Sequence, residues 1–389
     1  MEMKIFVVCD VWLDIRNAQT IHIKELFKNL GKLSDTYLFA PKPKNIVNTV
    51  NIIFVPEVIP ICKSLFYQAF LFFYLFFYCL KLTPDVMYVR HSCLSFSPGL
   101  ISKIFRLPCV IEVNGLLIDE QKLIGSSKLA TIITKLSEKF SYKHAKKIVA
   151  VTQGIKREII RMYNIPDEKI VVIENGANTD LFKPIDQKEA RKELKLDQNT
   201  NYVCFVGNLA PWQGVEYLIQ AAPLILKHSN TKFLIVGDGI MKEKLIELTY
   251  KIGVADKFIF TGEFPYEEVP KYINASDVCV APFIKERNMK IGISPLKIYE
   301  YAACGKPIVA SKIPNLEFIE MQKAGILVEP ENPEELAKAI IKLLKDEKLR
   351  EEMGRNGREY VVKYHSWKAV AKKVAEVCEN VVKEYNKRR

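Results

Sequence analysis

The sequence predicts an α/β protein made of two doubly wound parallel-sheet domains. Short apolar runs alternate with longer helical patterns along the chain, and the runs lack the polar alternation of half-exposed strands, which is typical of parallel sheets covered by helices on both faces. Thirteen such runs exceed one comfortable sheet, so two sheets are expected. The expected strands are Lys4–Cys9, Tyr37–Ala40, Ile52–Val55, Val86–Val89, Val110–Val113, Ile148–Val151, Ile170–Ile173, Tyr202–Val206, Lys232–Val236, Phe258–Thr261, Val278–Ala281, Ile308–Ala310 and Ile326–Val328.

Helical patterns lie between most of these runs. The clearest cover Ile21–Leu30, Gly154–Tyr163, Val215–Leu226, Lys242–Ile252 and Leu296–Ala303. An Asn/Gly/Asp/Pro-rich stretch, 175–185, predicts the break between domains at 1–175 and 176–365. The last helix, about 366–389, repeats apolar residues at spacings of three and four, so we expect it to return to the first domain.

The composition argues against a disordered chain, a zinc protein and an exported protein. Of the 389 residues, 49% are hydrophobic, which is too apolar for disorder. Nine scattered cysteines without a CxxC pair indicate reduced, buried thiols in a cytosolic protein, and five scattered histidines offer no zinc site. The chain start resembles a short buried strand more than a signal peptide, so no export is expected.

Net charge favours an anionic partner. The formal charge is +12, and residues 1–178 hold 23 basic and 15 acidic residues, so most of the excess lies in the first half. Phosphates, nucleic acid or an anionic membrane surface could be that partner. The ordinary alternative is a soluble protein that is merely rich in lysine. No nucleic-acid-binding motif accompanies the charge.

Two segments of the first half suggest a lipid interface. Residues 65–80 are apolar except for Gln68, and as a helix they span about 24 Å, too short to cross a bilayer. A buried helix is the favoured alternative, but a helix that is apolar all round also suits a lipid surface. Residues 128–147 combine an apolar face (Leu129, Ile132, Ile133, Leu136 and Phe140) with many lysines, as in helices that lie on anionic lipid. We therefore expect the first domain to meet the inner face of the cell membrane.

Glycine turns follow two strands of the second half. Gly207 and Gly214 flank a loop before a helix, and Gly237-Asp238-Gly239 follows the next strand. Such turns let backbone N–H groups approach phosphate. A lone GxG is more often a tight packing turn, and no P-loop motif occurs.

The strongest local pattern runs from Ser294 to Ala310. Ser294 is expected to cap a helix with Pro295 in its first turn, followed by Leu296. Lys297 and Glu300 then lie one turn apart beside a positive helix N-terminus. A phosphate clamp next to a hydroxyl-accepting carboxylate suits a nucleotide-sugar, whereas the ordinary alternative is a simple Lys–Glu pair.

Taken together, the second half resembles the family 4 retaining glycosyltransferases, also called glycosyl transferases group 1. The resemblance runs from about Ala145 to Leu344 and is carried by VVIENGANTDLFKP, VGNLAPWQGVEYLIQAA, FLIVGDGIMKEKL and SPLKIYEYAACGKPIVAS. It implies the GT-B fold, with two Rossmann-like domains facing a cleft. It also implies transfer of a sugar from a nucleoside diphosphate in the second domain to a glycan or lipid-linked acceptor on the first, without a metal or other cofactor.

The resemblance also implies roles for individual residues. Glu300 would bind the donor ribose, Lys297 the diphosphate, and the turn around Gly262 would flank the base. The implied donor site comprises Gly207, Asn208, Gln213, Gly214, Gly237, Gly262, Ser294, Pro295, Leu296, Lys297 and Glu300. The implied catalytic residues are Asn114, Lys297 and Glu300, and the implied acceptor loop comprises Asn17, Ala18 and His22.

The chain departs from the family pattern at several of these positions. The usual Arg and Lys of the phosphate loop are Asn208 and Gln213, and the first of two paired glutamates falls on Gly292. Asn17-Ala18 replace a Gly-Gly pair. These departures shift the expected phosphate contacts to Lys297 and, in the adjoining loop, to Lys285, Arg287 and Lys290.

The sequence leaves alternatives for the role of one residue and for the function of the whole chain. Asn114 replaces the usual mid-domain His and either contacts the transferred sugar or caps the Gly115 turn. The whole chain is either an active transferase or a catalytically silent partner subunit or carbohydrate-binding protein. A third possibility is an epimerase or phosphorylase built on the same fold.

Overall fold

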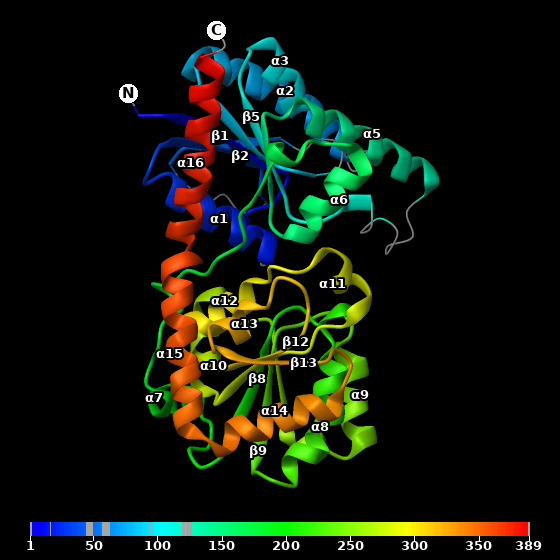
Figure 1. The fold of residues 1–389 in the computed structure, drawn as a ribbon, viewed down its shortest axis with the longest axis vertical. Coiled ribbons are helices and arrows are strands. Elements are labelled where there is room, and N and C mark those ends of the chain that lie inside the picture. The colour runs from blue at the N-terminus through cyan, green and yellow to red at the C-terminus, as the bar shows by residue number, and fades with distance from the viewer. Residues whose placement is uncertain are drawn as a thin grey trace. The chain divides into compact units, whose positions relative to one another are not determined.

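The structure is a computed structural model that describes residues 2–15, 17–43, 50–56, 63–92, 95–118, 121 and 127–387, without the side chains of 63–65 and 287. The chain divides into two compact units (Figure 1). Unit 1 comprises Met1–Glu174 and Lys368–Arg389, and unit 2 comprises Asn175–Trp367. The C-terminal helical segment therefore belongs to the first unit.

Unit 1 is built on a parallel sheet of seven strands in the order β3-β2-β1-β4-β5-β6-β7. The strands are β1 (Lys4–Val8), β2 (Asp35–Pro41), β3 (Ile52–Val55), β4 (Val86–Arg90), β5 (Cys109–Val113), β6 (Lys147–Ala150) and β7 (Ile170–Val172). The helices are α1 (Ala18–Leu30), α2 (Lys63–Leu82), α3 (Ser97–Ile104), α5 (Lys128–His144), α6 (Gln153–Tyr163), the short η1 (Asp167–Lys169) and α16 (Trp367–Asn386).

Unit 2 has a six-stranded parallel sheet in the order β10-β9-β8-β11-β12-β13. The strands are β8 (Asn201–Val206), β9 (Thr231–Val236), β10 (Phe258–Gly262), β11 (Val278–Ala281), β12 (Ile308–Ser311) and β13 (Gly325–Val328). The helices are α7 (Gln187–Glu193), η2 (Pro211–Gln213), α8 (Val215–Leu226), α9 (Lys242–Ile252), η3 (Ala255–Lys257), η4 (Tyr266–Glu268), α10 (Val269–Ala275), α11 (Lys285–Ile291), α12 (Leu296–Ala303), α13 (Phe318–Met321), α14 (Pro333–Lys345) and α15 (Glu347–Tyr364).

Each of the thirteen predicted strands is present, with ends that differ by at most two residues; β1, for example, ends at Val8. Alternate residues of β8 enter two different apolar cores, Tyr202 and Cys204 in one and Val203 and Phe205 in the other. Both faces of this sheet are therefore covered, as continuous apolar strands predict. In each sheet the strand order reverses, at β1/β4 and at β8/β11, so the predicted doubly wound class is confirmed.

The cysteines that the structure describes are buried, free thiols. Burial raises the pKa of Cys9, Cys109, Cys204 and Cys378 to about 12. These thiols stay protonated at neutral pH and act as small apolar core residues.

The aromatic segment 65–80 forms most of α2, and the helix is only half buried. Tyr67, Leu71 and Leu75 face the protein, whereas Phe73 and Phe77 are 68% and 58% exposed, so the helix buries one side, as a helix on a sheet does, and exposes the other. Among the described residues, no helix combines the length and hydropathy needed to cross a membrane.

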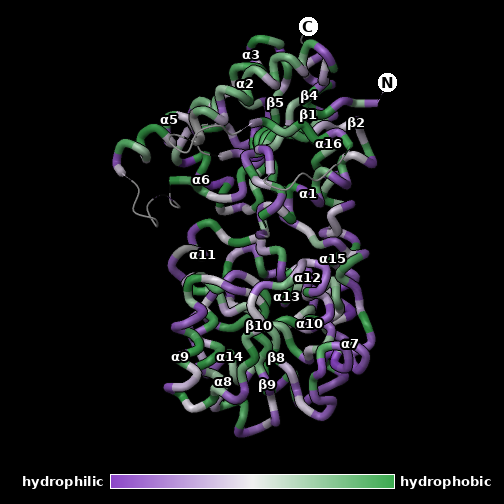
Figure 2. The backbone as a smooth tube through the Cα atoms, turned by 180° about the vertical axis from the view of Figure 1, so that it is seen from behind, coloured by the Kyte–Doolittle hydropathy of each residue, from purple (hydrophilic) through white to green (hydrophobic). Residues whose placement is uncertain are grey.

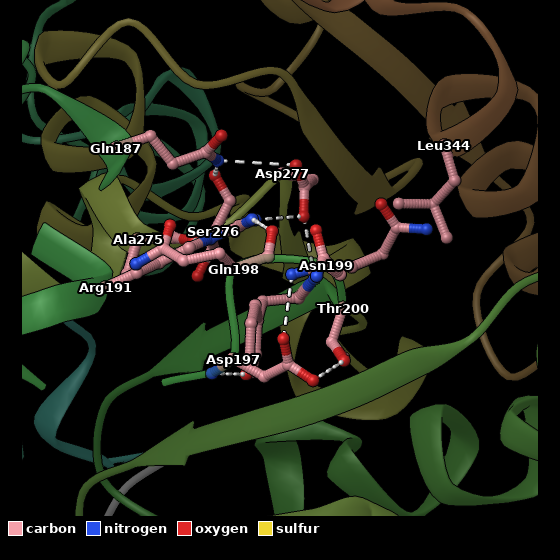
Figure 3. Close-up of polar contacts among 12 residues, drawn as sticks. Gln187, Arg191, Asp197, Gln198, Asn199, Thr200, Ala275, Ser276, Asp277 and Leu344 are labelled. Carbon is pink, nitrogen blue, oxygen red and sulfur yellow. Dashed lines mark hydrogen bonds and ion pairs between the residues drawn. The ribbon is translucent and has the colours of Figure 1, made fainter. Parts of the chain in front are cut away.

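A buried ion pair ties α7 to the sheet of unit 2 (Figure 3). Arg191 Nη2 lies 2.8 Å from Asp277 Oδ2, and both side chains are less than a tenth exposed. Asp277 also accepts from the backbone N–H of Tyr202 at 2.7 Å, and Arg191 Nε donates to the carbonyl of Ala275 at 2.9 Å. The guanidinium thus joins α7 to the segment that leads from α10 into β11.

We predict that Arg191→Met lowers the free energy of unfolding of unit 2 by about 3–5 kcal/mol, because it leaves the buried Asp277 carboxylate without its counter-ion. Urea denaturation measures this loss. The matched control is Lys257→Met, which removes a 2.8 Å pair with Asp256 whose side chains are 36% and 71% exposed. That control is expected to cost less than about 1 kcal/mol. Equal losses in the two variants would contradict a structural role for the buried pair.

Candidate functional site

The loops after β8, β9 and β10 meet at the carboxyl edge of the unit 2 sheet. The N–H of Gly207 donates to the carbonyl of Val236 at 2.9 Å, and Gly237 and Gly262 form an isolated antiparallel bridge. A Cβ at Gly237, whose φ is +137°, would lie 2.1 Å from the carbonyl oxygen of Gly207. The GxG turn therefore permits close packing between two loops, the ordinary alternative for such a turn.

Gly214 fixes the other end of the Gly207 loop. Its φ is +67°, and a Cβ there would lie 1.9 Å from the carbonyl oxygen of Pro282, so only glycine fits. The residue follows η2 and precedes α8, and it thereby sets the position of Gln213. Asn208 is exposed at the start of the same loop, with its amide oxygen over Gly239.

Lys297, in the first turn of α12, lies against this loop. Its Nζ donates to Gln213 Oε1 at 2.8 Å and lies 3.8 Å from the centre of the Phe205 ring. A Cβ on Gly207 would lie only 2.7 Å from the same Nζ. Without a side chain, Gly207 leaves the space that the ammonium group occupies, so the loop and the lysine fit one another.

The buried environment of Lys297 makes its protonated form less stable. Burial lowers the pKa of the Lys297 ammonium to about 7, although the nearby charge of Glu300 acts in the opposite direction. An anion that entered beside Nζ would supply the counter-charge that the protein does not fully provide and would favour the protonated form. The site is therefore suited to binding an anionic group.

Glu300 lies one helical turn beyond Lys297 and is 5% exposed. Its Oε1 accepts a hydrogen bond of 2.9 Å from the hydroxyl of Tyr266 in η4. Tyr266 was not among the sequence candidates, and nothing in its local sequence distinguishes it, because the contact depends on how the β10 loop packs on α12. Sequence spacing does place Lys297 and Glu300 together, and the structure has both within the same buried turn.

The prediction that Ser294 caps α12 is wrong. Pro295 occupies the N-cap position, with no side-chain cap. Ser294 Oγ instead accepts from the backbone N–H of Asn175 at 2.9 Å and contacts the hydroxyl of Tyr299 at 3.1 Å. Ser294 thus anchors the segment that opens unit 2, and the first N–H groups of α12, including that of the buried Leu296, have no serine cap.

The adjoining loop contains α11. Lys285 and Lys290 are exposed there, and the backbone N–H of Lys285 donates to Glu331 Oε1 at 2.7 Å. The side chain of Arg287 lies outside the described part. Gly292, which ends α11, has φ +67° and ψ −179°, and a Cβ there would lie 2.8 Å from the carbonyl oxygen of Pro314. A side chain at position 292 would therefore be strained by the backbone conformation and crowded by Pro314.

In unit 1, the predicted acceptor-loop residues surround the start of α1. Asn17 is the N-cap, and its Oδ1 accepts from the N–H of Thr20 at 2.9 Å; Ala18 is the first helical residue. His22 is buried, and its Nε2 lies 2.8 Å from Glu112 Oε1. Asn17 thus caps α1, and His22 links α1 to β5, so both side chains have structural roles in unit 1.

Asn114 follows β5 at the carboxyl edge of the unit 1 sheet, close to Glu112. Burial raises the pKa of the Glu112 carboxyl, but His22, the charge of Arg90 and the Asn114 amide outweigh burial and leave it lowered. Arg90 and Glu112 were missed as candidates. The available signal was a charged residue within an otherwise apolar, buried strand, which requires compensating partners.

Comparison with known proteins identifies the family. A sequence profile described as "Glycosyl transferases group 1" matches residues 186–360, and one described as "Glycosyltransferase Family 4" matches residues 19–181. An uncharacterized glycosyltransferase of Methanocaldococcus jannaschii is 30% identical over 306 residues, which cover 75% of this chain and 74% of the relative. The chain belongs to the family 4 glycosyltransferases. It is therefore an enzyme of the hexosyltransferase type.

Solved structures share the fold of this family 4 glycosyltransferase. Sucrose-phosphate synthase from Thermosynechococcus elongatus superposes with a TM-score of 0.77 at 20% identity, over 97% of this chain and 99% of that one. Anabaena HepE in complex with UDP has a TM-score of 0.77 at 18% identity, over 97% and 100% of the two chains. At these identities the likeness shows the fold alone, and the predicted GT-B class is confirmed.

We predict that Gly214→Ala destabilises unit 2 more than Gly253→Ala does. Both glycines have a left-handed backbone, with φ of +67° and +78°, so both variants carry about 1–2 kcal/mol of backbone strain. Only Gly214 adds a collision, because nothing lies within 4 Å of a Cβ at Gly253. Thermal denaturation of the two variants measures the difference. A Gly214→Ala variant as stable as Gly253→Ala would show that the loop adapts freely.

Proposed function

We propose that this glycosyltransferase transfers a sugar from a nucleoside-diphosphate donor, with retention of anomeric configuration, to a glycan or lipid-linked acceptor at the cytosolic membrane surface. One observation carries the donor assignment: Lys297 and Glu300 are buried in one turn of α12, beside a glycine loop at the carboxyl edge of a parallel sheet. Nucleotides bind at this edge in many doubly wound sheets.

The diphosphate is assigned to Lys297 and the loop from Gly207 to Gly214. Lys297 supplies one charge, and the N-terminus of α12 adds its partial positive charge. Together they would stabilise the departing nucleoside diphosphate, so the proposed reaction needs no metal ion. Gln213, which holds Nζ at 2.8 Å, orients the lysine where the family usually has a second cation.

Glu300 is assigned to the donor ribose. A carboxylate accepts hydrogen bonds from two adjacent hydroxyl groups, and Tyr266 restrains the Glu300 carboxylate through Oε1. HepE, of the same fold, has been solved with UDP-glucose. A relative from Mycobacterium tuberculosis, 30% identical over 54% of this chain, is described as GDP-mannose-dependent. Uridine and guanosine nucleotides are therefore both candidate donors.

Retention is assigned to attack from the leaving-group side. The acceptor hydroxyl oxygen forms a bond to the anomeric carbon on the face from which the diphosphate departs. The bond between the anomeric carbon and the diphosphate oxygen breaks. A departing phosphate oxygen takes the hydroxyl proton, so no enzyme nucleophile is required. Asn114 is the unit 1 residue assigned to contact the transferred sugar.

The proposal predicts that one nucleoside diphosphate, UDP or GDP, raises the melting temperature with EDTA present. A ligand at about 100 times its dissociation constant stabilises a protein by about 2.7 kcal/mol. Glu300→Gln, which keeps the side-chain volume, is expected to abolish the difference between ribose and deoxyribose nucleotides. Differential scanning fluorimetry with both series measures these shifts.

No shift with any nucleotide or nucleotide-sugar would overturn the donor assignment and favour a silent partner subunit. A shift that requires added Mg²⁺ would overturn metal independence alone. Product formed without an acceptor would instead point to epimerase chemistry.

Nucleotide affinity is also predicted to fall as pH rises above 7. Lys297 has a pKa of about 7 in the free protein, so it is charged below that pH and neutral above it, and the diphosphate binds the charged form. Lys297→Met is expected to weaken binding by about 1.5–3 kcal/mol near pH 6.5 and to flatten the profile above pH 7. Titration calorimetry between about pH 6.5 and 9 measures both effects. This pH range lies above the phosphate ionisation near pH 6, so the charge of the nucleotide changes little across it.

The matched control is Lys251→Met, which removes an exposed lysine at the far end of α9. It is expected to keep the wild-type affinity and pH profile. A Lys297→Met variant with the same profile as Lys251→Met would remove Lys297 from the diphosphate site.

A further inference from the structure

Helix α5 has its amphipathic faces the wrong way round for a helix that packs on a core. Its buried residues are Thr134, Glu138, Ser141 and Tyr142. Its apolar stripe points outward: Leu129, Ile132, Ile133 and Leu136 are 67%, 56%, 43% and 62% exposed. Surface helices of globular proteins bury their apolar stripe, so this arrangement implies that something else covers the stripe.

The inward face of α5 is held by polar contacts. The hydroxyl of Ser141 donates to the carbonyl of Ser95 at 3.1 Å, and Tyr163 donates to the Glu138 carboxylate. The imidazole Nε2 of His91 lies 3.7 Å from Glu138 Oε1. Because these contacts fix the rotation of the helix, its apolar stripe is held toward the outside.

Helix α2 presents a second outward apolar stripe. Phe73, Phe77 and Leu80 are 68%, 58% and 63% exposed on its outer face. Aromatic side chains at this exposure cost free energy in water, and α2 shows this face to solvent over several turns.

Helix α3 connects the two stripes into one surface. Phe105, just past the end of α3, packs against α2, and its ring centre lies 5.1 Å from that of Phe76. Lys103 of α3 packs against α5, and its Nζ lies 5.0 Å from the centre of the Phe140 ring. Its own Ile104 is 54% exposed. Figures 1 and 2 show the three helices along one side of unit 1, with hydrophobic colouring prominent on α2 and α3. We call the outward sides of α2, α3 and α5 the three-helix face.

The charge of the three-helix face is of one sign. The three helices contain a single acidic residue, Glu138, and it is buried. Exposed lysines flank the apolar stripes, among them Lys103, Lys128, Lys135 and Lys139. Such a surface repels a second copy of itself, whereas anionic lipid headgroups complement the lysines and acyl chains accept the apolar side chains.

We propose that the three-helix face binds the surface of an anionic lipid bilayer, with α2 and α5 lying along the interface and their apolar stripes inserted between headgroups. The inference rests on the proposed function in so far as that function places the acceptor at a membrane. It adds which surface of the enzyme meets the lipid and which lipid charge that surface requires. No described helix spans a bilayer, and the proposed contact needs none.

The test is co-sedimentation of the full chain with vesicles of phosphatidylcholine mixed with phosphatidylglycerol, and with vesicles of phosphatidylcholine alone. Binding to the mixed vesicles is expected, weakening as salt is raised. Ile132→Glu/Leu136→Glu is expected to weaken it by about tenfold or more, because both side chains lose burial in lipid. Lys135→Gln/Lys139→Gln is expected to weaken it by roughly tenfold, with the loss greatest at low salt.

Matched controls lie in unit 2. Met321→Glu adds an acidic group at an apolar side chain that is 75% exposed, and Lys244→Gln/Lys251→Gln removes two exposed lysines from α9. Both controls are expected to bind vesicles as the wild type does. Circular dichroism and the melting temperature without ligand show that every variant is folded.

Three results would overturn the proposal: a wild type that stays in the supernatant with both vesicle types, face variants that bind as well as their controls, or a lipid-free dimer that Ile132→Glu/Leu136→Glu dissociates. The last would assign the face to a second copy of the chain. Failure of the donor assignment is a separate result, because the nucleotide-induced melting shift is measured without lipid.

Discussion

In unit 2, the proposed donor site depends on how closely two backbone loops approach each other. Gly237 brings its backbone against the carbonyl of Gly207, at a distance that no side chain would permit. Gly207 itself has no side chain, which leaves open the space in which the Lys297 ammonium lies, and Gln213 accepts a hydrogen bond from that ammonium. The position of the positive charge offered to a ligand thus depends on close backbone packing at two glycines.

The fold could be predicted from sequence because its signal is spread over many residues. Thirteen apolar runs each specify a strand, and an error of one residue at an end, as at Cys9, leaves the sheet unchanged. The pairing of Lys297 with Glu300 was also predictable, since both lie on one helical turn. Contacts that join distant segments were not: Tyr266 reaches Glu300 across 34 positions, and Ser294 binds Asn175 across 119.

Helix α5 shows why an amphipathic pattern predicts a helix without predicting which side faces the protein. Its apolar stripe was visible in the sequence, but the direction of the stripe is decided by Glu138, whose partners Tyr163 and His91 come from other elements. Gly292 illustrates the opposite limit. Its departure from the family pattern was visible in the sequence, whereas the crowding of its backbone by Pro314 could be seen only in the structure.

The polar attachment of α5 also has a thermal consequence. Apolar packing weakens on cooling, because its strength near room temperature comes from the entropy of water. Helix α5 is held to unit 1 in part by hydroxyl and carboxylate contacts, which do not share that dependence. Cooling should therefore weaken the attachment of α5 less than it would weaken the packing of two purely apolar faces, and the outward direction of its stripe should persist at low temperature.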